Sequence, residues 1–172
     1  MSLETKIIDE LVENSIYRIS ESTRMVTKSL THISEAELRS KPNESSNSIA
    51  NLILHLCGNI TQYAISSLGS KEDIRDRDTE FSNQSNLTKL ELLKKLTDTV
   101  ETAKSVIRKV STDEWLRKRE VQGYNFSGIG IVIHVVEHYS YHTGQIAFWV
   151  KQLKNKDLGF YAGVDLTVKN KN

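Results

Sequence analysis

Three histidines, His134, His138 and His142, recur at four-residue intervals near the end of the chain. They lie between Ile129 and Leu153, in a largely apolar stretch with the spacing of an amphipathic helix. Because a helix turns by about 100° per residue, a step of four returns to within about 40° of its starting direction, and the three imidazoles should form one stripe. Two imidazoles on successive helical turns can reach one ion. The spacing indicates a metal site, with a row of hydrogen-bonded core histidines as the alternative.

Another histidine, His55, lies within a second apolar segment. Amides stand four residues before, four after and seven after it, at Asn51, Asn59 and Gln62. Such a polar line across an apolar helix is ordinarily the face that meets solvent. The position of Leu52 places His55 near the boundary of the apolar face, so a ring that faces the core is the alternative.

Four long helices should position these residues, because apolar side chains recur every three to four positions and the chain has one proline. Sequences with the pattern of a capping box start three helical segments, at Ser34 with Glu37, Thr88 with Glu91, and Ser111 with Glu114. The pattern predicts helices from the Ser2 N-cap to about Ile33, from Ile49 to Leu68, from Lys89 to Val110, and from about Ser127 to Lys154 or Asn155. Residues 121–126 are expected to be extended around Gly123.

The connection from Ser70 to Ser85 is dense in charge, and Ile74 and Phe81 are its expected anchors. Its length favours a crossover along the bundle over a tight hairpin, so that the second and third long helices would run parallel. The arginines in it, at positions 75 and 77, are either a clamp for an anionic ligand or simply solvated.

Composition narrows the class of protein. The 172 residues suit one domain over residues 1–155, followed by a loosely packed C-terminal tail over residues 156–172. A net charge of +1 gives no support for binding nucleic acid, and no apolar run is long enough to span a membrane, so a small-molecule or protein partner is expected. The only cysteine, Cys57, cannot form an intrachain disulfide, and the polar N-terminus does not resemble a signal peptide, which favours a cytoplasmic location.

Two motifs together resemble the DinB/YfiT-like superfamily of metal-binding four-helix bundles: SNSIANLILHLCGNI around His55, and HYSYHTGQI, which contains His138 and His142. The likeness extends to about Leu153, and the segment RDRDTEF resembles a sub-group of undefined role. The resemblance implies an all-α four-helix bundle with a long crossover between helices 2 and 3. It also makes His55, His138 and His142 the metal ligands, while His134 falls outside the family pattern.

The family resemblance further implies a divalent transition metal, zinc or nickel most often, and a homodimer. Characterised relatives include thiol-dependent S-transferases and isomerases. Three neutral imidazoles add no charge to an ion, so a thiol or water at an open position would lose its proton near neutral pH. The leading hypothesis is a transferase that joins a low-molecular-weight thiol to a small electrophile. The alternatives are a hydrolase of a small amide or ester, and a non-catalytic, stress-associated metal-binding bundle.

Several nearby residues have two interpretations each. Tyr141, Gln145 and Asn59 lie at spacings that would let them hydrogen-bond the ligand histidines, but each is also an ordinary packed or solvated polar residue. Glu137 should face solvent rather than act as a general base. Gly144, inside the last helix, suggests close approach of a neighbouring backbone or a ligand.

Overall fold

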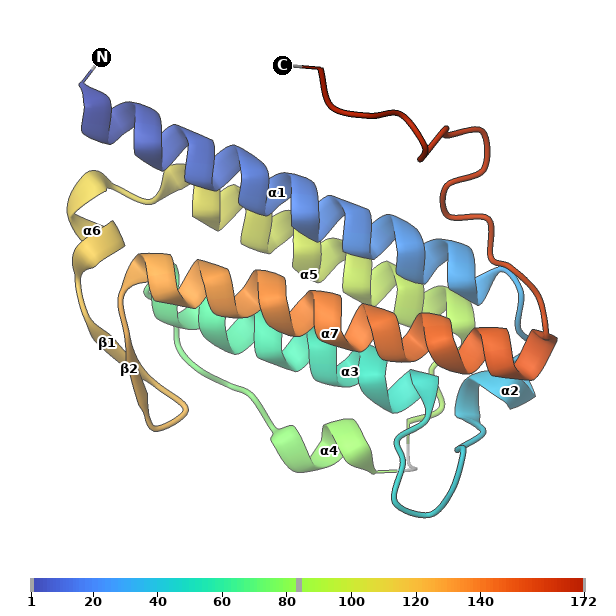
Figure 1. Cartoon of the computed structure of the whole chain (residues 1–172). Coiled ribbons are helices and arrows are strands. Elements are labelled where there is room, and N and C mark those ends of the chain that lie inside the picture. The colour runs from blue at the N-terminus through green and yellow to red at the C-terminus, as the bar shows by residue number, and fades with distance from the viewer. Residues whose placement is uncertain (1, 83–84, 172) are drawn as a thin grey trace.

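The computed structural model describes residues 2–82 and 85–171, and these form an all-α bundle with one small β-hairpin (Figure 1). The long helices are α1 (Leu3–Leu30), α3 (Ile49–Ile60), which continues as the π-helical segment η1 (Thr61–Leu68), α5 (Lys89–Lys109) and α7 (Gly128–Lys154). The short elements are α2 (Glu35–Arg39), α4 (Arg77–Phe81), α6 (Thr112–Leu116), β1 (Arg119–Val121) and β2 (Tyr124–Phe126). The predicted fold class is confirmed. None of the described helices has the length and apolarity that a membrane span requires.

The crossover between α3 and α5 lets these two helices run parallel, as predicted. Figure 1 shows α1 and α7 running one way along the bundle and α3 and α5 the other way. Contacts at one end agree, since the Lys89 ammonium at the start of α5 donates to the Ile33 carbonyl beyond α1, at 2.6 Å. At the same end, Lys154 at the C-terminus of α7 pairs with Glu37 of α2 at 2.6 Å. Helices α3 and α5 are therefore parallel neighbours.

Side-chain caps define most helix starts. Ser2, Ser48 and Ser127 each accept a backbone N–H of the first turn, and the capping boxes at Ser34 and Thr88 are both formed.

The third predicted capping box is wrong. Ser111 does precede α6, but its side chain makes no cap hydrogen bond. The carboxylate of Glu114 is instead bound by Arg117 and Arg119. Hydrogen bonds between two charged groups are stronger than a hydrogen bond to a neutral backbone N–H. The Glu114 carboxylate therefore binds the two arginines and not the backbone of Ser111.

The second long helix is not α-helical to Leu68 as predicted. After Ile60 the hydrogen bonds span five residues, as from the Gly69 N–H to the Ala64 carbonyl at 3.1 Å. A π-turn holds more residues than an α-turn, so the side chains beyond Ile60 point in directions that a continuous α-helix would not give them. One result is that the Tyr63 ring stacks on His134, with centroids 3.9 Å apart.

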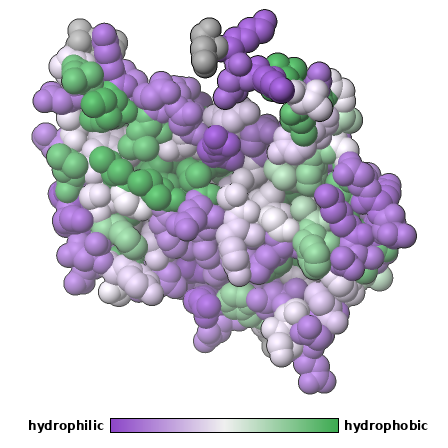
Figure 2. Space-filling model, in the orientation of Figure 1, coloured by the Kyte–Doolittle hydropathy of each residue, from purple (hydrophilic) through white to green (hydrophobic). Residues whose placement is uncertain are grey.

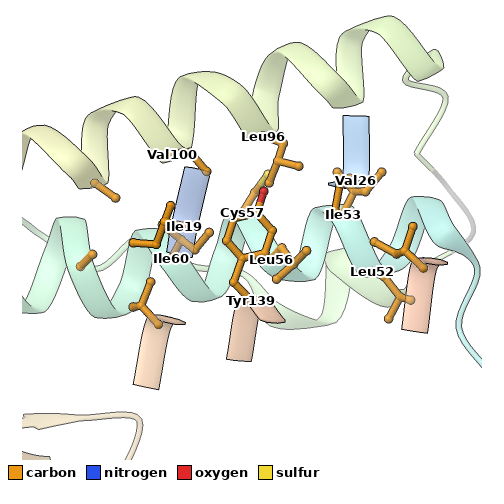
Figure 3. Packing of buried hydrophobic residues seen from close by; sticks show 14 of the residues in the cluster. Ile19, Val26, Leu52, Ile53, Leu56, Cys57, Ile60, Leu96, Val100 and Tyr139 are labelled. Carbon is orange, nitrogen blue, oxygen red and sulfur yellow. The ribbon is translucent and has the colours of Figure 1, made fainter. Parts of the chain in front are cut away.

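The apolar core fills the space between the four long helices (Figure 3). Ile53 and Leu56 of α3, Leu96 of α5 and Tyr139 of α7 are all fully buried. Cys57 lies among them, and burial raises the pKa of its thiol to about 11, so it packs as a small apolar residue. The core therefore uses every long helix and needs none of the histidines.

Removal of one buried methyl group should lower the stability of the protein slightly without preventing folding. Ile53→Val is expected to lower the free energy of unfolding by about 0.5–1.5 kcal/mol, because a fully buried methyl group leaves a small cavity. Urea unfolding followed by circular dichroism measures the change. An unchanged midpoint would contradict the close packing of this position.

One face of the bundle carries a group of exposed apolar side chains. Helices α1 and α7 expose large apolar side chains, and Figure 2 shows apolar groups gathered on the face that these helices form. Examples are Ile7 and Ile133, which are 60% and 53% exposed. The charged crossover runs outside α3 instead (Figure 1).

The C-terminal segment begins in contact with the bundle. Leu158 is buried, and Arg24 of α1 donates to the Phe160 carbonyl at 3.0 Å. Residues 161–171 are exposed. The division of the chain at residue 155 stays a prediction.

Candidate metal centre

Three histidines from two helices converge inside the bundle. Nε2 of His55 on α3 lies 2.9 Å from Nε2 of His138 on α7, and the ring of His142 lies 5.0 Å from that of His55 and 4.5 Å from that of His138. One ring nitrogen from each lies within 4.8 Å of the others. His55 and His142 are each 8% exposed. The structure thus brings together the three residues that the family pattern pointed to.

The polar line on α3 does not face solvent, so the ordinary interpretation of that line is wrong. Asn51, His55 and Asn59 are all buried, because α7 and the crossover pack against this side of α3.

The donor set fits a divalent transition metal ion. Zinc–nitrogen bonds of about 2.0–2.1 Å in a tetrahedral site place the ligand nitrogens about 3.3 Å apart, within the span observed here. Burial lowers the pKa of His142, and burial together with the neighbouring imidazoles lowers the pKa of His138 to about 3. These rings are therefore neutral at physiological pH and keep a lone pair for a metal.

His55 Nδ1 contacts Glu80, which the sequence did not predict, and Arg75 Nη2 lies 3.2 Å from the same nitrogen. The Glu80 carboxylate oxygen Oε2 lies 2.9 Å from His55 Nδ1. A carboxylate and a nitrogen lone pair would repel at this distance, so Nδ1 carries the proton and donates it. In the neutral ring, Nε2 then has the lone pair and accepts from His138 Nε2, which lies 2.9 Å away. Burial opposes ionisation of Glu80, but the bonds from Arg75 and His55 outweigh it and lower the pKa of Glu80.

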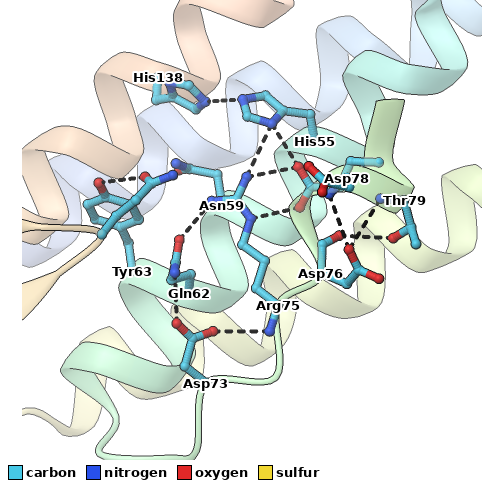
Figure 4. A network of polar contacts seen from close by, with 12 residues as sticks. His55, Asn59, Gln62, Tyr63, Asp73, Arg75, Asp76, Asp78, Thr79 and His138 are labelled. Atoms are coloured by element: carbon cyan, nitrogen blue, oxygen red, sulfur yellow. Dashed lines mark hydrogen bonds and ion pairs between the residues drawn. The ribbon is translucent and has the colours of Figure 1, made fainter. Parts of the chain in front are cut away.

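Arg75 is neither a solvated residue nor an exposed clamp. Its side chain is 3% exposed. Arg75 Nε donates to Glu80 Oε1 at 2.7 Å, and Arg75 Nη2 donates to Glu80 Oε2 at 2.8 Å (Figure 4). Arg77 stacks on the ring of Phe81, which in turn contacts the ring of His55. Phe81 therefore anchors the crossover to the bundle, as predicted. Ile74 does not, because its side chain is 78% exposed.

Gln145 orients His142 as the spacing suggested, whereas Tyr141 hydrogen-bonds Gln145 and not His138. The Oε1 atom of Gln145 lies 2.7 Å from His142 Nδ1, and Gln145 Nε2 donates to the Tyr141 hydroxyl at 3.1 Å. With the amide held this way, His142 Nδ1 is the donor and its Nε2 keeps the lone pair.

His134 lies beside the cluster and outside it. Its ring is nearly parallel to that of His138, with centroids 5.3 Å apart. Asn59 Nδ2 lies 3.2 Å from His134 Nε2, so the prediction that Asn59 supports His55 is wrong. Burial lowers the pKa of His134, which keeps a neutral imidazole one turn from the metal-ligand candidates.

A cavity of about 590 Å³ adjoins the centre at Gln145. Leu52, Phe148 and Trp149 supply its apolar wall. Much of the rest comes from the amides and hydroxyls of Asn43, Ser45, Ser46 and Asn47, and no charged residue in the described part of the chain lines it. A Cβ at Gly144 would meet no other described residue within 4 Å, so the prediction that a neighbouring backbone approaches it closely is wrong.

Comparison with known proteins agrees with the fold. Residues 6–162 match a family model described as a protein of unknown function, DUF1572. No curated protein matches the sequence significantly.

Three solved structures share the architecture. A DinB-like protein, YjoA, from Bacillus subtilis is 18% identical with a TM-score of 0.65, over 88% of this chain and 96% of that one. A DinB-like protein from Bacillus cereus is 11% identical with a TM-score of 0.67, over 85% and 92%. A conserved protein from Enterococcus faecalis is 16% identical with a TM-score of 0.63, over 91% and 99%. The chain has a DinB-like fold, and it belongs to the DUF1572 family.

Proposed function

We propose that the protein is a metal-dependent enzyme in which His55, His138 and His142 hold a divalent transition metal, with zinc or nickel as the leading candidates. The observation that carries this proposal is the convergence of two buried imidazoles and one half-buried imidazole, with one ring nitrogen of each within 4.8 Å of the others. Three protein ligands leave a coordination position open, which is typical of catalytic zinc sites, whereas structural sites are usually closed by cysteine. The only cysteine, Cys57, lies in the apolar core.

The favoured chemistry is transfer of a low-molecular-weight thiol to a small electrophile. A metal in this position would lower the pKa of the thiol, so that the nucleophile is available near neutral pH. Glu80 and Gln145 hold the imidazoles in place, and the uncharged cavity beside Gln145 suits a neutral, partly apolar electrophile. The family resemblance adds a homodimer to this proposal, and the single cysteine favours a cytoplasmic location.

A hydrolase of a small amide or ester is the second candidate. The observation that favours it is His134, a neutral and half-buried imidazole beside His138, whose Nε2 could take a proton from a water molecule in place of its contact with Asn59. A non-catalytic metal-binding bundle is the remaining alternative.

Metal analysis followed by thiol titration separates these candidates. Elemental analysis of untagged protein should find about one divalent transition metal per chain, and absence of metal from protein purified or reconstituted with zinc, nickel or cobalt would contradict the proposal.

In cobalt-substituted protein, a thiol such as bacillithiol should add a sulfur-to-cobalt charge-transfer band if it reaches the metal. Failure of every thiol to do so, together with turnover of an activated ester, would contradict the transferase and favour the hydrolase. Absence of any exchangeable coordination position would contradict both enzymes.

A further inference from the structure

The crossover segment, residues 70–82, reaches the candidate centre through a buried ion pair. Most charged side chains of this segment are exposed, but the Arg75 and Glu80 side chains are only 3% and 7% exposed. Removal of two opposite charges from water is favourable only when good geometry and further hydrogen bonds compensate for the lost hydration. The environment of this pair should therefore satisfy nearly all of its donors and acceptors.

Hydrogen bonds satisfy the polar groups of this ion pair, first around Glu80, which is next to His55, and then around Arg75, which lies further out (Figure 4). Glu80 accepts from His55 Nδ1 and from two nitrogens of Arg75. Arg75 uses its remaining terminal nitrogen to donate to Gln62 Oε1 at 2.8 Å. Asp73 then accepts from the Gln62 amide at 2.7 Å and from the Arg75 backbone N–H at 3.1 Å. The chain of contacts runs from solvent to a candidate metal ligand without a break.

One face of the second long helix is shaped to receive this segment. Asn51 Nδ2 donates to the Glu80 carbonyl at 3.0 Å, four residues before His55. Three residues after His55, Gly58 leaves the space that Glu80 occupies, since a Cβ there would lie 1.8 Å from Glu80 Oε1. Gln62, a further turn along, binds Arg75. Asn51, His55 and Gln62 of the polar line therefore form the docking surface for the crossover, while Asn59 contacts His134.

We infer that Glu80, held by Arg75, is a positioning residue for His55, and that the crossover segment becomes more ordered when the centre binds its metal. This inference rests on the proposed metal site. By accepting the proton of Nδ1, Glu80 removes the tautomer in which Nε2 is protonated and unable to bind an ion. A metal on Nε2 makes the Nδ1 proton a better donor, which strengthens the bond to Glu80. Because coupling between two sites is reciprocal, docking of the segment and metal affinity must support each other.

Two variants perturb the same carboxylate from opposite sides. Glu80→Gln keeps the shape of the side chain but turns an NH₂ group toward a donor, either Arg75 or His55. Gly58→Ala leaves Glu80 intact and displaces it sterically. Each is expected to weaken metal affinity about 10–100-fold, measured by competition with a chromophoric chelator. Asp78→Asn removes an equal charge from an exposed part of the segment, and Gly144→Ala makes the same substitution where nothing lies nearby, so both controls should retain full affinity.

A second measurement does not depend on the metal. Nitrogen-15 NMR of the histidine rings in metal-free protein should show His55 protonated at Nδ1, and both Glu80→Gln and Gly58→Ala should shift it toward a mixture of tautomers.

A third measurement follows the order of the crossover segment. Hydrogen exchange in residues 70–82 should slow on metal addition in the parent protein, and it should slow less in Glu80→Gln and Gly58→Ala. Unchanged tautomer and affinity in variants whose circular dichroism is native would overturn the inference. Absence of metal from the parent protein would instead contradict the proposed function, while the tautomer would still report on Glu80.

Discussion

His138→Ala is expected to abolish stoichiometric metal binding while leaving the helix content largely intact. His138 supplies one of three converging nitrogens, and two imidazoles hold an ion far more weakly than three. Its ring is half-buried at the edge of the core, whereas the packing of the bundle rests on apolar residues from all four long helices. Elemental analysis and far-ultraviolet circular dichroism measure the two effects on the same sample.

His134→Ala is the matched control for that experiment. His134 lies one turn earlier on the same helix, with similar burial, and its hydrogen bond goes to Asn59 rather than to the cluster. Its removal should leave the metal content at the parental value. Full metal occupancy in His138→Ala, or loss of metal in His134→Ala, would show that the ligand set is wrong.

Leu96→Ala should have the opposite outcome, with a large loss of stability and no loss of metal from folded protein. Leu96 is fully buried on α5, a helix that contributes none of the three histidines (Figure 3). Truncation of such a leucine removes apolar contacts and leaves a cavity, which lowers the free energy of unfolding by about 2–5 kcal/mol. Urea unfolding measures this change, and elemental analysis of the folded fraction measures the metal.

Leu90→Ala makes the same substitution on the same helix at a position that is 76% exposed. The expected change in the free energy of unfolding is within about 0.5 kcal/mol. Equal effects of the two leucine variants would contradict the packing of α5 against the core. Together with the histidine pair, they separate the residues that hold the fold from those that form the site.

Local sequence patterns were enough to predict the long helices and to single out the histidines that could bind a metal. Apolar residues at helical spacing and serine or threonine N-caps act within one or two turns of the chain, so their effect can be predicted without knowledge of the tertiary fold. The length of the charged connection was enough to predict the crossover. The histidines themselves became a set of three only through the resemblance to a family, because spacing alone also allowed His134.

The tertiary structure alone decided which groups support those ligands. Glu80 lies 25 positions from His55 in the chain and is one of many charged residues in its segment, so no local signal distinguishes it. Its partner Arg75 had the appearance of a solvated residue, and Asn59 had the spacing to serve His55 but hydrogen-bonds His134 instead. The physical reason is that helix starts depend on neighbours along the chain, whereas burial of a charge depends on what distant segments bring against it.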